Sequence, residues 1–409
     1  MFNRIIASNF KSIEKLDIDL KEINVVIGAN ASGKSNFVDI FEFLKLVVKN
    51  GLEEAVVKFG GMKNLINYNS SSRSFSIELS ITPLEEEGNH PFFKRMLPNN
   101  YLIIHVNYKF VLTYRKGKIP DFRIDSEELV YRIQSQENEG DLRIKRDNKN
   151  LLSIHFPKLI KLREKQETED INKFFGEFFR VAKPHKLLIE GSGAIDILPL
   201  IDDFKRIGVY DIYPKYAKEN TKIGRESKLK KDGSNMADTI LRIRESYDDR
   251  MLLQTKIRNL LPFIKSLSVK AGEENDIRFY VKENYFGRKE MPSQLISYGS
   301  INIFALIIAL YFENNKITVI EEPERNLHPL LILSICELFK EVSKFNQIII
   351  TTHNIEMIKN LADFNILIVR REEDGNSIIK SEKDIKEIKE FLKNDLGIED
   401  LFFQNFPGI

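Results

Sequence analysis

Short apolar runs alternate with amphipathic segments at both ends of the chain, and this pattern indicates the fold. Residues 23–27 are apolar apart from one asparagine, which is typical of a strand buried on both faces. Residues 36–48 then carry apolar side chains at the three- and four-residue spacing of a helix. Near the C-terminus we expect strands at 317–320, 347–350 and 364–369 and an apolar helix at 301–312. Strands that alternate with helices in this way predict an α/β fold.

The first part of the middle region has the period of strands. Residues 73–156 predict mainly antiparallel strands, because stretches such as 74–81 alternate apolar and polar side chains. The Lys-Gly-Lys sequence at 116–118 has the composition of a hairpin turn. Together these features predict an antiparallel β subdomain.

The second part of the middle region has the period of helices. From 158 to 261 we predict an inserted helical arm, with Ser234 as a candidate N-cap and Pro262 as a stop. It has too few heptads for a long coiled coil. Residues 264–285 return to strands, and 380–409 predict a charged helix with a short apolar end.

Composition sets limits without naming a partner. The 409 residues exceed what one core usually covers, so we expect two lobes. The net charge of +2 favours no class of partner, and the single cysteine, Cys336, excludes a disulfide framework. The longest apolar run, 303–312, is shorter than the roughly 20 residues of a membrane span, and the N-terminus does not resemble a signal peptide. We therefore predict a soluble cytoplasmic protein with no membrane partner, and the six histidines predict no zinc site.

The segment from Gly28 to Ser35 fits the phosphate-binding P-loop G-x-x-x-x-G-K-[ST] at every fixed position. A strand before it and a helix after it give the context that the motif needs, which weighs against a chance match in a glycine turn. Lys34 would reach the phosphates of a nucleoside triphosphate, and the Ser35 hydroxyl would ligate Mg²⁺. The residues predicted to contact the nucleotide here are Gly28, Asn30, Ala31, Ser32, Gly33, Lys34, Ser35 and Asn36.

An acidic cluster follows the expected strand at 317–320. Glu321 and Glu322 stand at the strand end, where a Walker B element delivers carboxylates beside a P-loop. Glu321 would hold Mg²⁺, and Glu322 would orient and deprotonate the attacking water. Pro323 has no N–H for the ladder and ends the strand. The alternative is a solvated acidic turn.

Two further features complete the candidate chemistry. His353 follows the strand at 347–350 and is predicted to contact the γ-phosphate, the alternative being a structural histidine. The turn from Ser297 to Ser300 feeds the helix at 301–312 and would form a second anion site. One chain does not need two phosphate sites for one nucleotide, so this turn would serve a nucleotide held by another copy. The alternative is an ordinary helix cap.

This order of motifs resembles the ABC-type ATPase heads of the SMC, RecF and OLD group, and above all its prokaryotic AAA-family ATPases. The segments 6–13 (IASNFKSI), 232–237 (DGSNMA) and 327–329 (LHP) are similar to the family as well. The resemblance implies a P-loop ATPase head that dimerises around ATP and Mg²⁺. It implies Lys34 on phosphate, Ser35 and Glu321 on magnesium, Glu322 as catalytic carboxylate, His353 as switch histidine, Ser297 and Gly299 on the γ-phosphate in trans, Asn326 in a dimer-spanning loop, and Lys11 near the nucleotide.

The sequence departs from ABC transporters at several positions. Glu321 stands where they have Asp, and Tyr298 and Ser300 replace their Gly and Gln in the signature. No clear glutamine loop is present. The predicted domains are 1–157 as the N-terminal half of the head, 158–261 as the inserted helical arm, and 262–409 as the C-terminal half.

The expected function is an ATP-hydrolysing switch that acts on DNA or on a partner effector protein, in DNA repair or phage defence. The segment Tyr213–Lys231 carries seven basic residues against Glu219 and Glu226, a net charge of +5, and could contact DNA or be a solvated loop. The alternative function is a non-catalytic ATP-gated clamp whose partner supplies the chemistry. We expect no C-terminal nuclease domain, because only 56 residues follow His353.

Overall fold

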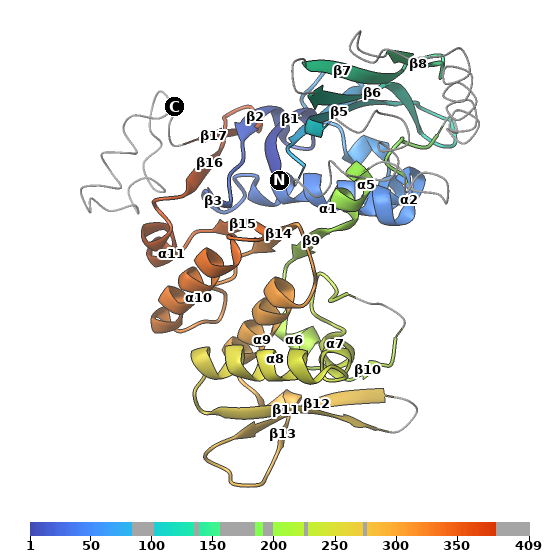
Figure 1. Cartoon of the computed structure of the whole chain (residues 1–409). Helices are drawn as coiled ribbons and strands as arrows, with labels where there is room; N and C mark the ends of the chain where they lie inside the picture. Colours follow the sequence, from blue (N-terminus) through green and yellow to red (C-terminus); the bar gives the residue numbers. More distant parts are fainter. Residues whose placement is uncertain are drawn as a thin grey trace. The chain divides into compact units, whose positions relative to one another are not determined.

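The computed structural model describes residues 1–83, 102–134, 139–155, 185–190, 199–224, 228–272 and 276–381 (Figure 1). They form two compact units. The first contains the described residues of 1–21, 29–207 and 368–384, and the second contains 22–28 and the described residues of 208–367. The chain enters the second unit briefly at 22–28, and this short excursion includes the strand that precedes the P-loop.

An antiparallel sheet forms the body of the first unit. Its strands are β1 (Phe2–Phe10), β2 (Ile13–Asp19), β4 (Ser74–Ile81), β5 (Leu102–Tyr114), β6 (Phe122–Gln134), β7 (Glu139–Arg146), β8 (Leu152–His155) and β17 (Ser377–Ser381). They are ordered β8-β7-β6-β5-β4-β1-β2-β17, and β17 pairs with β2 in the parallel sense. Lys118 N donates to Arg115 O in the turn between β5 and β6, where Gly117 has a φ of 70°. The predicted antiparallel subdomain is confirmed.

Phenylalanines join helix α1 (Lys34–Asn50) to this sheet. Phe43 lies 6.2 Å from Phe10 and 5.8 Å from Phe75 between ring centroids, and all three rings are fully buried. Burial of one such ring stabilises the fold by about 2–3 kcal/mol, so this cluster fixes the position of α1. The remaining helical elements among the described residues of the unit are α2 (Leu52–Lys58), η1 (Met62–Asn64) and α5 (Pro199–Lys205).

Parallel strands form the centre of the second unit. β3 (Ile23–Ile27) pairs with β15 (Gln347–Thr352), and β15 pairs with β14 (Ile317–Glu321). β9 (Ile207–Tyr210) follows β14 in the strand order, and β16 (Asn365–Arg371) leads the chain back to the first unit. These pairings confirm the strands that the apolar runs predict.

Three helices accompany these strands: α9 (Tyr298–Tyr311), α10 (Pro329–Val342) and α11 (Ile355–Asn360). Every residue of α9 from Ser300 to Leu310 is buried, which accounts for the longest apolar run of the sequence. No helix of the described part of the chain is long and apolar enough to cross a membrane.

A small antiparallel sheet and short helices complete the second unit. The sheet consists of β10 (Thr221–Lys222), β12 (Asp276–Glu283), β11 (Ile264–Ala271) and β13 (Met291–Pro292). Alternate residues of β12 are buried, which leaves its other face to Arg278, Tyr280 and Lys282. The helical elements are α6 (Pro214–Ala217), α7 (Met236–Ile243), α8 (Tyr247–Leu260) and η4 (Ser293–Leu295).

The prediction of Ser234 as an N-cap is wrong. Helix α7 begins at Met236 with Asn235 as its N-cap, and no side chain caps it. The Asn235 amide instead accepts from Lys230 N and donates to Lys228 O, so it stabilises the preceding turn. The predicted stop at Pro262 is confirmed, since α8 ends at Leu260. Much of the predicted arm (158–184, 191–198 and 225–227) and nearly all of the predicted tail helix (382–409) lie outside the described residues, and the domain boundaries stay a prediction.

Candidate functional site

The P-loop has the geometry of a phosphate-binding turn. β3 ends at Ile27, and Ala31 and Gly33 take positive φ values of 62° and 113° before α1 begins at Lys34. No side chain caps α1, and the positive dipole end of such a helix favours a phosphate. Lys34 Nζ donates to Ala29 O over 2.9 Å, across the turn from one end to the other.

Serines from the far end of the sequence support this loop from within the first unit. Ser377 Oγ donates to Ser32 O over 2.7 Å and lies 2.7 Å from Ser12 Oγ. A Cβ on Gly33 would lie 2.2 Å from Ser377 Oγ, so only glycine fits at this position. Arg371 Nη1 adds a hydrogen bond of 3.3 Å to Ala31 O. Sequence reasoning missed these supports because 345 residues separate Ser377 from Ser32.

A cavity of about 470 Å³ opens beside the start of α1. Polar side chains, one arginine and one aromatic ring line it, among them Asn36, Asn67, Tyr68 and Arg371. Tyr68 is 73% exposed, so its ring is available to a ligand. Lys11, predicted to lie near the nucleotide, also lines the cavity, where its ammonium pairs with Asp39.

The carboxyl ends of three parallel strands meet at one edge of the second unit. In the strand register Ile27 is paired with Thr352, and Thr351 is paired with Glu321. The next residue of each strand is therefore at the same edge, and these are Gly28 of the P-loop, His353 and Glu322. Ligands of α/β proteins bind at such edges.

The acidic pair at this edge is held by basic side chains. Glu321 Oε1 lies 3.8 Å from Lys231 Nζ. Glu322 Oε2 accepts from Arg325 Nη2 over 3.1 Å, and Glu322 Oε1 lies 3.3 Å from His353 Nδ1. The two residues predicted to be catalytic, Glu322 and His353, are thus neighbours, whereas nothing in the sequence pattern indicated Lys231 or Arg325 as partners of the glutamates.

A third carboxylate, Glu324, is buried beneath the pair. Thr352 Oγ1 donates to Glu324 Oε1 over 2.5 Å, and burial raises the pKa of this carboxyl. Glu322 itself has a φ of 45°, and its N–H donates to Thr351 O over 2.9 Å. The turn that carries Glu322 is therefore attached to β15 by backbone as well as side chain.

The signature turn and the turn after Glu324 share one surface. Ser297 is the N-cap of α9 and accepts from Ser300 N over 3.2 Å, which is the bond of the ordinary helix cap given as the alternative to an anion site. Gly299 packs so closely on the second turn that a Cβ would lie 2.7 Å from Asn326 O. Ser297 and Asn326 are exposed, which leaves both accessible to a second molecule.

Three of the six described basic residues of the segment Tyr213–Lys231 contact other parts of the second unit. Its internal contacts are Lys218 with the Tyr298 ring, Lys228 with Asn315, and Lys231 with Glu321. Lys215, Lys222 and Lys230 are exposed, and Arg225 lies outside the described residues. Part of the positive charge of this segment is therefore used in contacts within the second unit.

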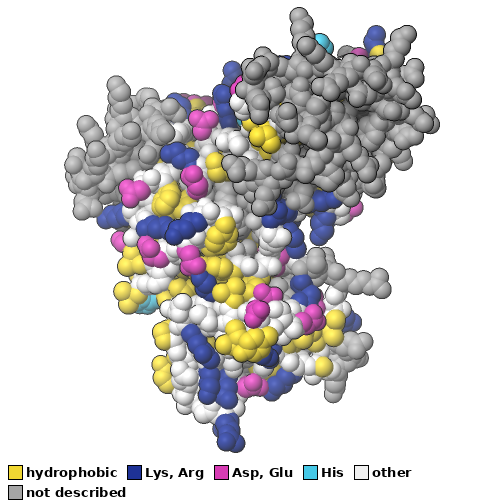
Figure 2. Space-filling view, viewed as in Figure 1, with side chains coloured by type: hydrophobic (Ala, Val, Ile, Leu, Met, Phe, Trp, Pro, Cys, Tyr) yellow, Lys and Arg dark blue, Asp and Glu magenta, His cyan; other side chains and the backbone are white. Residues whose placement is uncertain are grey.

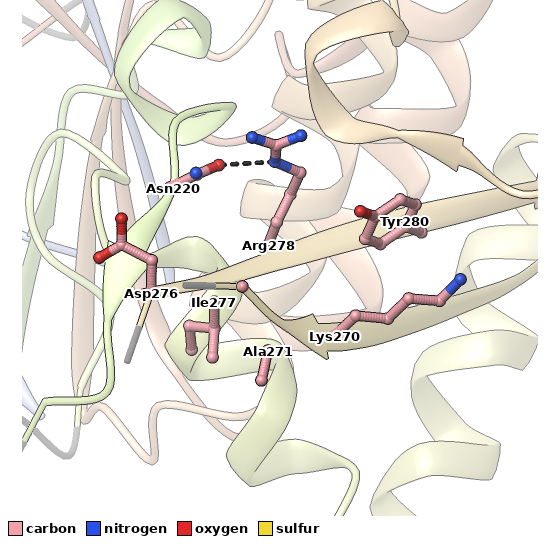
Figure 3. A pocket seen from close by; sticks show the side chains of 8 residues that line it. Asn220, Lys270, Ala271, Asp276, Ile277, Arg278 and Tyr280 are labelled. Carbon is pink, nitrogen blue, oxygen red and sulfur yellow. Dashed lines mark hydrogen bonds between the residues drawn. The ribbon is translucent and has the colours of Figure 1, made fainter. Parts of the chain in front are cut away.

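A second cavity, of about 410 Å³, opens on the outer face of β11 and β12 (Figure 3). Arg278 Nε donates there to Asn220 Oδ1 over 2.6 Å, and Lys270 pairs with Glu290 over 2.7 Å. Figure 2 shows Lys and Arg side chains gathered over this small sheet. None of the residues that line this cavity belongs to the P-loop or to the acidic turn.

The fold and the strand edge define a P-loop ATPase of the mixed α/β class. Residues 23–88 and 116–359 match the family AAA_21, described as "AAA domain, putative AbiEii toxin, Type IV TA system", and the chain belongs to this family. Membership implies that the chain binds ATP.

Three known proteins are similar to this chain. The chain is 24% identical over 375 residues to Endonuclease GajA of Bacillus cereus (strain VD045), and the match covers 91% of this chain but only 58% of GajA. An SmcHead bound to the C-winged helix domain of ScpA superposes with a TM-score of 0.50 at 18% identity, over 94% of this chain and 99% of that one. The SMC head domain from Thermotoga maritima gives a TM-score of 0.43 at 16% identity, over 93% and 98%. The expected likeness to SMC heads is confirmed.

Proposed function

We propose that this chain binds ATP with Mg²⁺ and hydrolyses it. The observation that carries the proposal is the strand register, which gives Gly28, Glu322 and His353 one common sheet edge. Family membership supports ATP as the nucleotide.

Each polar residue then has a role that fits its chemistry. Lys34 and the N–H groups of the P-loop bind the phosphates. The Ser35 hydroxyl and the Glu321 carboxylate supply the oxygen ligands that Mg²⁺ prefers, and the ion neutralises charge on the phosphates. Glu322 orients water and accepts its proton, and His353 contacts the γ-phosphate.

The cavity beside α1 is the proposed site of the nucleoside. It adjoins Asn36 at the first turn of α1, and it offers amide groups to a base and an aromatic face at Tyr68. Aromatic stacking on a base contributes about 1–3 kcal/mol.

Two copies would close over the nucleotide. Ser297 and Asn326 are exposed, the half-buried Gly299 packs on Asn326 O, and the positive end of the α9 dipole favours an anion. We propose that this surface contacts the γ-phosphate held by the partner copy, so that hydrolysis releases the dimer.

Steady-state phosphate release tests the proposal. Lys34→Ala should abolish ATP binding, and Glu322→Gln should bind ATP without hydrolysing it. Light scattering of Glu322→Gln with ATP and Mg²⁺ should give a dimer. Wild-type release no faster than that of Glu322→Gln would contradict the enzyme, and a monomer under all conditions would contradict the closed dimer.

The alternative is a non-catalytic clamp that binds ATP and dimerises without turnover. The observation in its favour is that Lys231 and Arg325 already neutralise both glutamates of the acidic pair. Nucleotide-dependent dimerisation of the wild type, with phosphate release equal to that of Glu322→Gln, would select the clamp.

The partner is proposed to be DNA or an effector protein, as in DNA repair or defence against phage. The likeness to an endonuclease and the family's description as part of a toxin–antitoxin system support this direction. The chain spans 58% of the relative's length, so the relative's own activity is not transferred.

Binding of DNA by the segment Tyr213–Lys231 can be tested at its exposed lysines. Lys215→Glu with Lys222→Glu should weaken binding of an oligonucleotide and flatten its salt dependence, because each contact releases counterions. Lys340→Glu, at a half-buried lysine of α10 outside this segment, is the control. Equal oligonucleotide binding by the wild type, the double variant and the control would show that the segment does not bind DNA.

A further inference from the structure

One guanidinium connects the proposed catalytic carboxylate to a distant segment of the second unit. Arg325 lies three residues after Glu322 and binds its Oε2 through Nε at 3.3 Å and Nη2 at 3.1 Å. Its Nη1 donates to Asp211 Oδ1 over 2.9 Å, across 114 residues of sequence. The guanidinium carbon lies 5.3 Å from the centroid of the Tyr213 ring.

This arrangement fixes the arginine itself. A lone exposed ion pair at i,i+3 contributes about 0–1 kcal/mol and would leave both side chains mobile. Here the planar guanidinium is bound by Glu322 on one edge and by Asp211 on another, and the Tyr213 ring lies against it, so it has one orientation. Burial alone would lower the pKa of Arg325, yet Asp211 and Glu322 raise it, so the guanidinium stays charged.

The segment that holds Arg325 is itself secured. Asp211 N donates to Lys231 O over 2.9 Å, and Tyr213 N donates to Asp232 O over 3.1 Å. Lys231 in turn lies against Glu321. The paired segments 211–213 and 231–232 therefore reach both glutamates of the acidic turn. Asp211 reaches Glu322 through Arg325, and Lys231 contacts Glu321 directly.

We propose that Arg325 is a positioning residue for Glu322, and that Asp211 is its anchor. This inference rests on the proposed function, because it assigns Glu322 the task of aiming water. Arg325 holds Oε2 of Glu322 while Oε1 lies 3.3 Å from His353 Nδ1, so the orientation of the whole carboxylate is fixed. A misplacement of about 1 Å at such a group can cost up to 100-fold in rate.

The experiment compares kcat and KM for ATP in Arg325→Ala, Arg325→Lys and Asp211→Asn. We expect Arg325→Ala to lower kcat about tenfold with KM within about twofold, since the interaction acts on the water and not on ATP binding. Arg325→Lys should recover part of this loss, Asp211→Asn should lower kcat less, and Asp211→Asn should add nothing in the Arg325→Ala background. Arg132→Ala, which removes a comparable ion pair with Asp141 in the first unit, should leave kcat unchanged.

Several results would overturn the inference. These are an unchanged or raised kcat in Arg325→Ala, an effect on KM alone, or a lysine variant no better than alanine. Failure of the proposed function is distinguishable, because wild type would then release phosphate no faster than Glu322→Gln. In that case the melting temperatures of Arg325→Ala, Glu322→Gln and the double variant decide. If the double variant lowers the melting temperature by less than the sum of the two single variants, the residues are coupled and the inference is supported. If the shifts add, it is refuted.

Discussion

Gly299→Ala tests the close packing between the signature turn and the turn that contains Asn326. The added Cβ would lie 2.7 Å from Asn326 O and 3.6 Å from Leu327 Cδ2. The first distance is too short for carbon and oxygen, and the oxygen belongs to the backbone, so the whole turn must shift. Any loss of stability therefore reports on this contact.

Two opposing effects set the magnitude. Alanine in place of glycine stabilises a helix by about 0.5–1 kcal/mol, and Gly299 is the second residue of α9. Overpacking a close contact costs about 1–3 kcal/mol. We expect a net loss of about 1–2 kcal/mol, which lowers the melting temperature by about 2–8 °C in a domain of this size.

Thermal unfolding and phosphate release are the assays. Gly272→Ala is the matched control, because its Cβ would meet its nearest atom at an ordinary 3.5 Å. Gly299→Ala should melt lower than wild type while the control does not, and it should lose ATP hydrolysis because the proposed dimer surface is displaced. A higher melting temperature would show that helix propensity wins and that the contact is loose.

The remaining predictions concern the first unit. Burial raises the pKa of Glu190 to about 7 from an ordinary 4.5. The folded state therefore favours the protonated carboxyl, and the contribution of Glu190 to the free energy of unfolding is complete below pH 4.5. As the pH rises to 7 this free energy falls by about 3 kcal/mol. Glu190→Gln should remove this slope in melting temperatures measured from pH 4 to 8. Tyr68→Ala should weaken ATP binding about five- to tenfold in a fluorescence titration, whereas equal affinity would exclude stacking on Tyr68. Gly33→Ala should abolish ATP binding, because its Cβ collides with Ser377 Oγ and φ is 113°; unchanged affinity would refute the tight loop.

Local patterns predict the elements that carry the candidate chemistry. The apolar run at 23–27 and the helical spacing that follows are sufficient for β3, the P-loop and α1, because each depends on neighbours within a few residues. The strands that end at Glu321 and Thr352 are predictable for the same reason. Ser234 shows the limit of such reasoning, since α7 begins after Asn235, whose amide bonds the backbone of Lys228 and Lys230 and leaves the helix without a side-chain cap.

What local patterns cannot predict is which charges become partners. The net charge of Tyr213–Lys231 favours an external anion, yet Lys231 lies against Glu321 within the same unit, 90 residues further along the sequence. Likewise, the sequence gives no sign that Arg325 has a partner, because Asp211 lies 114 residues before it and meets it only in the fold. A buried or half-buried charge needs an opposite charge, so the acidic turn at the end of β14 requires basic side chains from somewhere in the fold. That requirement follows from elementary electrostatics, but the strand order that puts β9 beside β14 decides which residues meet it. Because Lys231 touches Glu321 and Asp211 holds the arginine that binds Glu322, variants of Asp211 and Lys231 should change kcat in the phosphate-release assay, although neither residue belongs to a recognised motif.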